Sequence, residues 1–302
     1  MTHTSSTPWS VADIPDQTGR TVIITGANSG LGAETATALA ARGAHVVLAC
    51  RNTAKAGEVA ARIGDKATVR ALDLADLDSV RAFAGTVGGA DVLINNAGIM
   101  AVPLRRTAQG FESQIGTNHL GHFALTALLL PTITDRVVTL SSGLHQLGRI
   151  DLGDLNWERR RYRRWQAYGD SKMANLMFGL ELAERLRAAG SAIRSQIAHP
   201  GYASTGLVGH TETLLDPIAR LGARLPIAQS AADGALPTLL AATAPDAESG
   251  RFYGPTQLFG LRGAPGRSGY NARARDRAIR EGLWRESERL TGIDFDVMGT
   301  LA

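Results

Sequence analysis

Tyr168 and Lys172 stand four positions apart in the stretch QAYGDSKMAN, a spacing that makes two side chains neighbours on one helix face. An ammonium close to a phenol stabilises the phenolate and so lowers the pKa of the tyrosine from its ordinary value of about 10. Such a tyrosine can exchange a proton with a substrate oxygen near neutral pH. The spacing also describes a solvated lysine beside a half-buried tyrosine, so the surrounding sequence has to decide between the two interpretations.

The rest of the chain alternates short β-branched runs with longer alanine-rich segments of helical spacing. That alternation predicts βαβ units and a parallel sheet with helices on both faces. We expect one doubly wound α/β domain of the Rossmann type at residues 20–302, including a C-terminal helical extension, after an N-terminal arm at residues 1–19. The predicted sheet is mostly parallel and has about seven strands, at residues 21–25, 44–50, 67–72, 91–95, 136–142, 193–199 and 251–255.

The first predicted strand runs into TGANSGLG, where Gly26, Gly30 and Gly32 precede a helical pattern. Glycines allow a sharp turn and a close backbone approach to a pyrophosphate, and a helix N-terminus offers N–H groups to the phosphates. The turn has no Lys-Ser/Thr pair of the kind that P-loop proteins use to bind nucleoside triphosphates. We therefore predict a dinucleotide as the ligand.

Short motifs follow the carboxyl ends of four further predicted strands. They are Asp73-Leu74, Asn95–Gly98 in NNAG, Ser141-Ser142 and the run HPGYAST, which ends at Thr205. The carboxyl ends of parallel strands meet at one edge of a doubly wound sheet, where ligands bind. Each motif is common alone, but together they predict one ligand-binding crevice.

This ordered set, with YGDSK as Y-x-x-x-K, resembles the short-chain dehydrogenase/reductase superfamily over residues 21–205. Within it, VVLACRN, TNHLGHF and SSGLHQLGRIDLGDLNW resemble the retinol-dehydrogenase-like branch and its bacterial relatives. The resemblance implies that Tyr168 is the general acid/base while hydride moves to or from a nicotinamide. It also implies that Lys172 binds the nicotinamide ribose. The substrate does not transfer with these motifs, because one fold hosts many functions.

Two further catalytic residues come from the same resemblance. Ser142 is expected to donate a hydrogen bond to the substrate oxygen, and Asn118 to complete a proton relay through water. Ser142 is preferred to Ser141 because the family motif uses the second serine of the pair.

A cofactor site also follows from the resemblance. Thr205 is expected to hold the nicotinamide carboxamide, and Asn95 and Gly98 to shape the adenosine side of the cleft. The residues expected to contact the cofactor are Gly26, Asn28, Ser29, Gly30, Leu31, Arg51, Asp73, Leu74, Asn95, Ala97, Gly98, Tyr168, Lys172, Pro200, Gly201 and Thr205.

The preferred cofactor is predicted to be NADP(H), with NAD(H) as the open alternative. An NAD site usually ends its second strand with an acidic residue that binds the ribose 2′-hydroxyl. Here VVLACRN has Cys50 and Arg51 at those positions. A guanidinium can bind a 2′-phosphate, which a carboxylate would repel. If Arg51 instead points into solvent, the site accepts both cofactors.

Composition excludes several other classes of protein. The 302 residues are 44% hydrophobic, enough for a large core, and the single cysteine, Cys50, excludes internal disulfides and multi-cysteine metal sites. A net charge of +4 with dispersed arginines argues against nucleic acid as a partner. His119 and His122 are expected to pack in the interior, so no metal is predicted. With no signal pattern and no apolar run long enough for an integral membrane segment, we expect a cytoplasmic protein.

The expected activity is the NADP(H)-dependent interconversion of an alcohol with a ketone or aldehyde, on a small apolar substrate. A homodimer or homotetramer is expected. The alternative is a dinucleotide-binding redox sensor without turnover, against which the intact set of Ser142, Tyr168 and Lys172 argues.

The long segment 143–167 is expected to loop out beside the cleft. Its aromatic residues Trp157, Tyr162 and Trp165 could wall a substrate site, or the segment is only a surface excursion. The basic run at residues 158–165 is expected to be a solvated loop.

Overall fold

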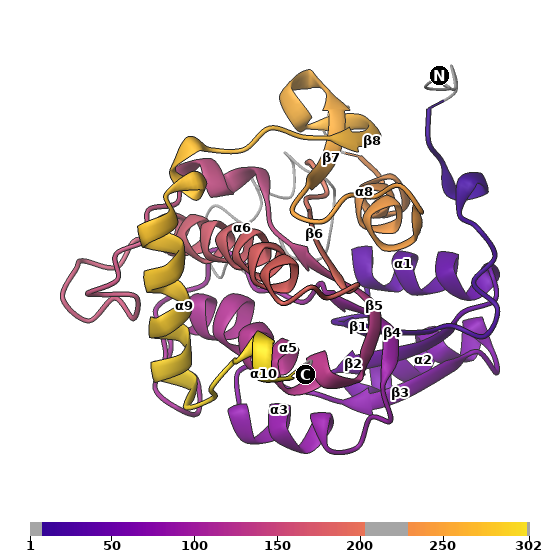
Figure 1. The fold of residues 1–302 in the computed structure, drawn as a ribbon. Coiled ribbons are helices and arrows are strands. Elements are labelled where there is room, and N and C mark those ends of the chain that lie inside the picture. The colour runs from indigo at the N-terminus through magenta and orange to yellow at the C-terminus, as the bar shows by residue number, and fades with distance from the viewer. Residues whose placement is uncertain (1–7, 203–228, 301–302) are drawn as a thin grey trace.

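The structure, a computed structural model, describes residues 8–202 and 229–300. Its described strands form one sheet in the order β3-β2-β1-β4-β5-β6-β7-β8, and every neighbouring pair is parallel except β7 and β8 (Figure 1). The order runs outward from β1 in both directions, which is the doubly wound arrangement predicted from the sequence. The strands are β1 Thr21–Thr25, β2 His45–Cys50, β3 Ala67–Ala71, β4 Ala90–Asn95, β5 Ile133–Leu140, β6 Arg194–Ala198, β7 Phe252–Gln257 and β8 Arg262–Arg267.

Helices cover both faces of the sheet (Figure 1). Residues of α1, α2 and α8 share one hydrophobic core cluster, and residues of α3, α5 and α6 share another on the opposite face. The described helices are α1 Gly30–Ala41, α2 Thr53–Ile63, α3 Leu77–Ala84, α4 Ser113–Ile115, α5 Gly121–Leu129, α6 Arg164–Ala188, α8 Ala231–Thr243, α9 Arg277–Thr291 and α10 Val297–Thr300.

Side chains of β1 show why the central strands are apolar throughout. Successive residues of a strand point to opposite faces. Val22 and Ile24 accordingly join the cluster with α1, whereas Ile23 joins the cluster with α5. A strand that is buried on both sides cannot alternate apolar and polar residues, which is typical of parallel sheets.

An eighth strand, β8, goes beyond the roughly seven that the sequence indicated. It lies antiparallel to β7 at the edge of the sheet. Its sequence, RGAPGR, contains two glycines and a proline, so it carries no β-propensity signal. Pro265 is tolerated there because an edge strand has no further neighbour that needs its N–H.

The described part of the N-terminal arm is packed against the domain. Ser10 and Asp13 form a capping box around a short 3-10 turn, and Ile14 is buried in the core cluster of α1. The Gln17 amide donates to the carbonyl of Arg42 at 2.8 Å, just after α1. The arm therefore lies along the outer end of α1.

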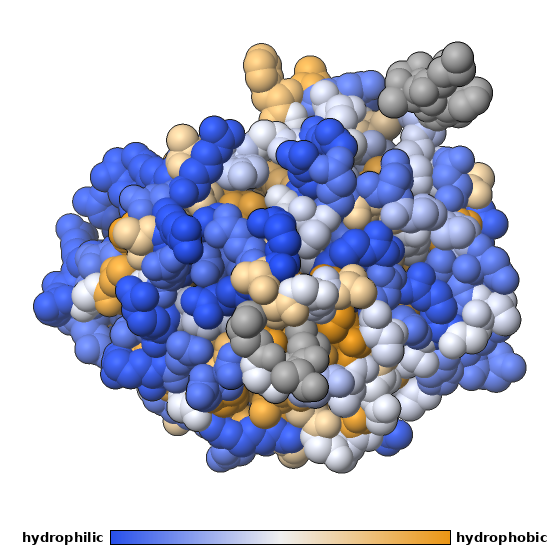
Figure 2. Space-filling model, viewed as in Figure 1, coloured by the Kyte–Doolittle hydropathy of each residue, from blue (hydrophilic) through white to orange (hydrophobic). Residues whose placement is uncertain are grey.

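The predicted C-terminal helix at residues 275–290 is α9. Its Trp284 stacks on Phe178 of α6, with ring centroids 5.7 Å apart, and on Phe295, at 4.8 Å. Hydrophilic residues cover most of the surface seen in Figure 2, with smaller hydrophobic areas between them. Within the described ranges, we find no helix with the length and hydropathy needed to cross a membrane.

Candidate active site

The glycine turn after β1 packs directly against the NNAG motif after β4. Gly26 has φ of +68°, and a Cβ there would lie 2.9 Å from the Cβ of Ala97. A Cβ on Gly32 would lie 2.6 Å from Nδ2 of Asn96, whose side chain donates to the Thr25 carbonyl at 2.7 Å. Both positions therefore require glycine, because a side chain would push the two loops apart.

Helix α1 begins at this turn with its first N–H groups directed to the carboxyl edge of the sheet. Ser29 occupies the N-cap position, and its side chain makes no capping hydrogen bond. The N–H groups of the first turn and the positive end of the helix dipole are suited to an anion such as a pyrophosphate.

A groove of about 440 Å³ extends from this turn along the carboxyl ends of the strands. Seven of the predicted cofactor residues line it: Gly26, Asn28, Arg51, Asp73, Leu74, Ala97 and Gly98. Its walls also include apolar side chains such as Leu72, Ile99 and Val102. This groove would fit a dinucleotide. The phosphates would lie at the glycine turn and the start of α1, and the rings would lie along the partly apolar walls.

Asn95 is predicted to shape the adenosine side of the cleft. Its side chain is buried and donates to Oγ1 of Thr126 on α5 at 2.9 Å. The last residue of β4 points into the core because of the alternation along that strand. Asn95 therefore contributes no side chain to the groove, and its place on the adenosine side of the cleft stays a prediction.

Residues Pro200 and Gly201 follow β6 at the same edge of the sheet. Gly201 has φ of +67°, and a Cβ on it would lie 2.7 Å from Pro255 of β7. Thr205 lies outside the described residues.

Arg51 extends from the end of β2 over the rim of the groove. Its side chain is 75% exposed, and Nη1 lies 4.0 Å from Oδ2 of Asp73. Two more cations, Arg105 and Arg106, also line the groove and were not predicted from the sequence. They follow NNAG by several residues, so only the path of the loop after β4 brings them to the groove.

Asn118 lies in a π-helical turn, Gly116–Leu120, between α4 and α5. Its Oδ1 accepts from the Ile99 amide at 2.8 Å, and its Nδ2 donates to the Ile99 carbonyl at 2.9 Å and to Oγ of Ser171 at 2.9 Å. These bonds tie the loop after NNAG to α6. Such π-helical turns often occur at functional sites.

Tyr168 and Lys172 are both buried on α6, beside the end of β5. Nζ of Lys172 donates to the Leu140 carbonyl at 3.3 Å and lies 5.9 Å from the centroid of the Tyr168 ring. A Cβ on Gly98 would lie 3.3 Å from this Nζ. Gly98 lines the groove, so Lys172 lies directly behind this part of the wall, although neither Tyr168 nor Lys172 is among the residues that line the groove.

The two serines after β5 have different partners. Oγ of Ser141 donates to the Lys172 carbonyl at 2.7 Å and is buried. The hydroxyl of Ser142 makes a hydrogen bond with Tyr168 and accepts from the Leu144 amide at 3.2 Å. Only Ser142 therefore stands beside the phenol.

Burial governs the pKa values of the pair. Loss of solvation raises the pKa of Tyr168 to about 12, although the bond with Ser142 acts to lower it. Loss of solvation also lowers the pKa of Lys172 to about 8. The pKa of Tyr168 is therefore raised and not lowered as expected, because desolvation of the phenol is the largest influence on it. Tyr168 is held as a neutral phenol, the form that donates a proton.

The interior packing predicted for His119 and His122 is confirmed. Nε2 of His122 lies 2.9 Å from Oγ1 of Thr25, and Nε2 of His119 lies 2.8 Å from Oγ of Ser287. Across the described residues, no three His, Cys, Asp or Glu side chains cluster as metal ligands would. Burial raises the pKa of the Cys50 thiol to about 11, which agrees with its predicted place in the core.

None of the three aromatic residues of segment 143–167 that could wall a substrate site is among the residues that line the groove. Trp157 is buried beneath the guanidinium of Arg160, 3.9 Å from its ring centroid. The Tyr162 hydroxyl bonds to Glu112 behind the groove. Trp165 is 46% exposed. The expected solvated loop at 158–165 is therefore partly anchored, because buried Asp154 holds residues 158–160 and buried Glu112 holds Tyr162.

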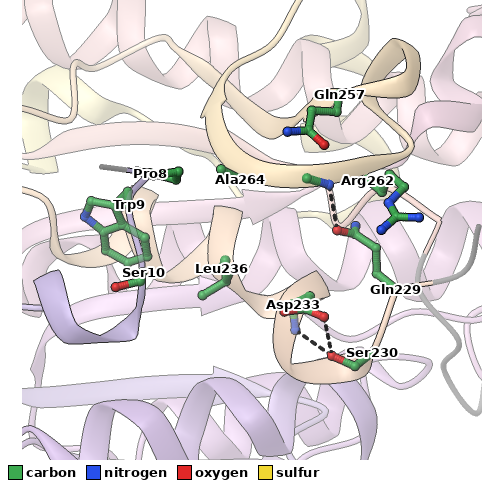
Figure 3. A pocket seen from close by; sticks show the side chains of 11 residues that line it. Pro8, Trp9, Ser10, Gln229, Ser230, Asp233, Leu236, Gln257, Arg262 and Ala264 are labelled. Carbon is green, nitrogen blue, oxygen red and sulfur yellow. Dashed lines mark hydrogen bonds between the residues drawn. The ribbon is translucent and has the colours of Figure 1, made fainter. Parts of the chain in front are cut away.

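A second cavity, of about 490 Å³, lies apart from the groove (Figure 3). Trp9 of the arm, Asp233 and Leu236 of α8 and Arg262 of β8 line it. In Figure 3, Ser230 and Asp233 bond to each other at the start of α8. None of the predicted catalytic or cofactor residues in the described part of the chain lines this cavity, so the groove is the candidate active site.

Comparisons with known proteins agree with this geometry. The family profile of the short chain dehydrogenases matches residues 20–214. Human retinol dehydrogenase 12 is 40% identical over 293 residues, which cover 92% of this chain and 88% of that protein. The crystal structure of an uncharacterized protein from Mycobacterium paratuberculosis is 53% identical, with a TM-score of 0.82 over 96% of this chain and 99% of that chain.

A Brucella melitensis 3-ketoacyl-(acyl-carrier-protein) reductase, solved as a complex with NADH, is 25% identical, with a TM-score of 0.60 over 78% of this chain and 96% of that chain. The profile match and the retinol dehydrogenase relative extend over most of the chain. The chain therefore belongs to the short-chain dehydrogenase family, in its retinol-dehydrogenase-like branch, and is an NAD(P)-dependent oxidoreductase that acts on CH–OH groups.

Proposed function

We propose that the protein interconverts an alcohol and a ketone or aldehyde with NADP(H), and that Tyr168 exchanges the proton. The observation that carries the proposal is the grouping of Tyr168, Ser142 and Lys172 beside the end of β5, where Gly98 of the groove wall lies next to the lysine. When bound, the nicotinamide supplies or accepts the hydride.

The chain's own residues would handle the proton and the substrate oxygen. In reduction, the Tyr168 phenol donates its proton to the carbonyl oxygen, and Ser142 donates a hydrogen bond to the same oxygen. The ammonium of Lys172 favours the phenolate that is left behind. Asn118 reaches Ser171, one residue before Lys172, and so stands where a water-mediated relay would leave the site.

The cofactor would lie along the groove with its phosphates at the start of α1. We propose Gly26, Asn28, Ser29, Gly30 and Leu31 for the phosphates, and Asp73, Leu74, Ala97 and Gly98 for the walls. Arg51 would bind the 2′-phosphate of NADP(H), because its guanidinium lines the groove and no acidic residue ends β2. NAD(H) is the alternative cofactor.

The substrate is proposed to be a small, apolar carbonyl or alcohol. Human retinol dehydrogenase 12, by its name, acts on retinol, and the groove of this chain has apolar side chains in its walls. We also propose that residues 20–302 act as one domain, because every described strand joins one sheet, and that the protein forms a homodimer or homotetramer.

The experiment is to follow NADPH oxidation with a panel of aldehydes and ketones of increasing size, and NADP⁺ reduction with the matching alcohols. We expect substrate-dependent turnover that favours apolar members of the panel. Tight NADPH binding without turnover of any member would overturn the proposal in favour of the redox-sensing alternative.

A further inference from the structure

Three polar side chains lie directly behind the wall of the groove. Glu112 and Gln114 are fully buried, and Tyr162 reaches them from the segment that precedes α6. None of the three is among the residues proposed to touch substrate or cofactor. Burying a polar group costs free energy unless the group is hydrogen-bonded. A buried cluster whose members are hydrogen-bonded fixes the positions of the segments that it joins.

The Gln114 side chain makes three hydrogen bonds that join two segments, the loop at Ala101 and the run from Tyr162 to Arg164. Its Oε1 accepts from the Ala101 amide at 2.7 Å, and its Nε2 donates to the Tyr162 hydroxyl at 2.8 Å and to the Arg164 carbonyl at 3.0 Å. A backbone N–H can only donate and a backbone carbonyl can only accept. The two ends of the amide are therefore not interchangeable in this place.

The bond to Ala101 supports a strained part of the groove wall. Ala101 has φ of +51° and is fully buried, a left-handed conformation that residues other than glycine rarely adopt. Its neighbours Met100 and Val102 line the groove. The Gln114 oxygen therefore holds the backbone in the conformation that presents these two side chains.

The bond to Arg164 reaches the first turn of the catalytic helix. Arg164 is the first residue of α6, and in a helix its carbonyl is the acceptor for the amide four residues later, that of Tyr168. Gln114 donates to this same oxygen. One side chain thus joins the groove wall at Ala101 to the turn that carries Tyr168.

Glu112 in turn fixes Gln114. Its carboxylate accepts from the Gln114 amide at 2.9 Å, from the Ile115 amide at 2.9 Å and from the Tyr162 hydroxyl at 3.0 Å. It caps the helical turn that continues into the π-helix of Asn118. The same buried cluster therefore supports the second proposed catalytic segment as well.

We infer that Gln114 is a positioning residue of the reaction, whose amide sets the separation between the groove wall at Ala101 and the Tyr168 turn of α6. The inference rests on the proposed function, since it supposes that the cofactor lies in the groove and that Tyr168 donates the proton. A shift in this separation moves the proton donor relative to the bound cofactor, and small misplacements of reacting groups are costly for rate.

The first test is Gln114→Ala, with kcat and KM for NADPH measured per folded protein. We expect kcat to fall by about tenfold or more and KM for NADPH to rise, because both ends of the link are released. The matched control is Gln196→Ala. Gln196 is equally buried, but its amide donates to the Ala247 carbonyl at 3.2 Å, and neither of these residues lines the groove. Its loss should lower stability and leave kcat per folded protein unchanged.

The second test is Gln114→Glu, which keeps the size of the side chain. As a carboxylate, it can accept from Ala101 but cannot donate to Arg164, whereas the protonated acid can do both. We expect its kcat, relative to that of the wild type, to recover as the pH is lowered. A residue needed only for stability would give no such recovery. If Gln114→Ala does not fold, the pH dependence of Gln114→Glu alone tests the positioning role.

The kcat and KM of the wild type and of Tyr168→Phe are measured in parallel with those of the Gln114 variants. If wild type reduces no carbonyl compound, the proposed function fails. If wild type is active and both Gln114 variants match its kcat and KM at every pH, only the positioning role is overturned.

Discussion

The Ser141 hydroxyl donates to the main-chain carbonyl of Lys172 at 2.7 Å, which fastens the end of β5 to the middle of α6. The next residue, Ser142, places its hydroxyl beside Tyr168. Adjacent serines thus take different tasks, because successive residues of an extended chain point in opposite directions. Ser141 holds the end of β5 against α6, and Ser142 faces Tyr168 in the proposed active site.

This relationship predicts opposite effects for two matched substitutions. Ser142→Ala should lower kcat by about a hundredfold with little change in stability, because it removes a donor to the substrate oxygen. Ser141→Ala should cost about 1 kcal/mol of unfolding free energy and leave kcat per folded protein near that of the wild type. Steady-state kinetics and urea unfolding of both variants check the pair. Equal losses of kcat would contradict the division of roles.

Tyr168→Phe is predicted to lower kcat by at least about a hundredfold while the affinity for NADPH stays nearly unchanged, since only the proton is lost and the ring is kept. Lys172→Met should instead weaken both cofactor binding and rate. Calorimetry with NADPH and steady-state turnover separate the two effects. A Tyr168→Phe variant with near-normal turnover would contradict the proposed mechanism.

Much of this arrangement was predictable because the carboxyl ends of parallel strands meet at one edge. Motifs as far apart as Asp73 and Gly201 could be placed together from the βαβ pattern alone, and both lie at that edge. The direction of a single side chain is different. Asn95 ends its strand as predicted, but its side chain points into the core. The pattern of residue types does not show toward which face of the sheet the last side chain of a strand points.

The support behind the groove was not predictable either. Gln114 and Tyr162 are far apart in sequence, and nothing in their types distinguishes them from surface residues. They meet because the loop after β4 and the segment before α6 pass on the same side of the groove. The direction in which the pKa of Tyr168 shifts was also not predictable from the sequence. It depends on how deeply the phenol is buried and how far it lies from the ammonium, and the i, i+4 spacing fixes neither.

Buried histidines predict a loss of stability in acid. Burial lowers the pKa of His119 to about 4 and that of His122 to about 3, from ordinary values near 6.5. The unfolded chain then binds more protons than the folded one, so stability is complete above about pH 6.5 and falls as the pH drops toward 4. For His119 this amounts to roughly 2 kcal/mol at pH 5.

The measurement is urea unfolding at pH 8 and pH 5 for wild type and His119→Phe. The variant removes a titrating group and should narrow the difference in unfolding free energy between the two pH values by roughly 2 kcal/mol. Phe178→Leu is the control, because it disturbs the same ring cluster without removing a proton site. An unchanged pH difference in His119→Phe would show that this histidine does not contribute to the acid loss.

Arg51 is predicted to select NADP(H) over NAD(H). Its guanidinium lies at the rim of the groove, 4.0 Å from the Asp73 carboxylate, and is exposed enough to turn toward a 2′-phosphate. A charge-assisted hydrogen bond contributes about 1.5 to 3 kcal/mol. This corresponds to a preference of roughly ten- to a hundredfold.

The measurement is kcat/KM with NADPH and with NADH, in wild type, Arg51→Ala and the control Arg70→Ala. Arg70 is also exposed, on the neighbouring strand β3, but does not line the groove. Arg51→Ala should lose most of the preference through a higher KM for NADPH, while NADH kinetics and the control stay as in wild type. A wild-type preference for NADH would overturn the prediction. An NADPH preference that survives Arg51→Ala would move the role to another cation of the groove, and Arg105 and Arg106 are then the residues to substitute.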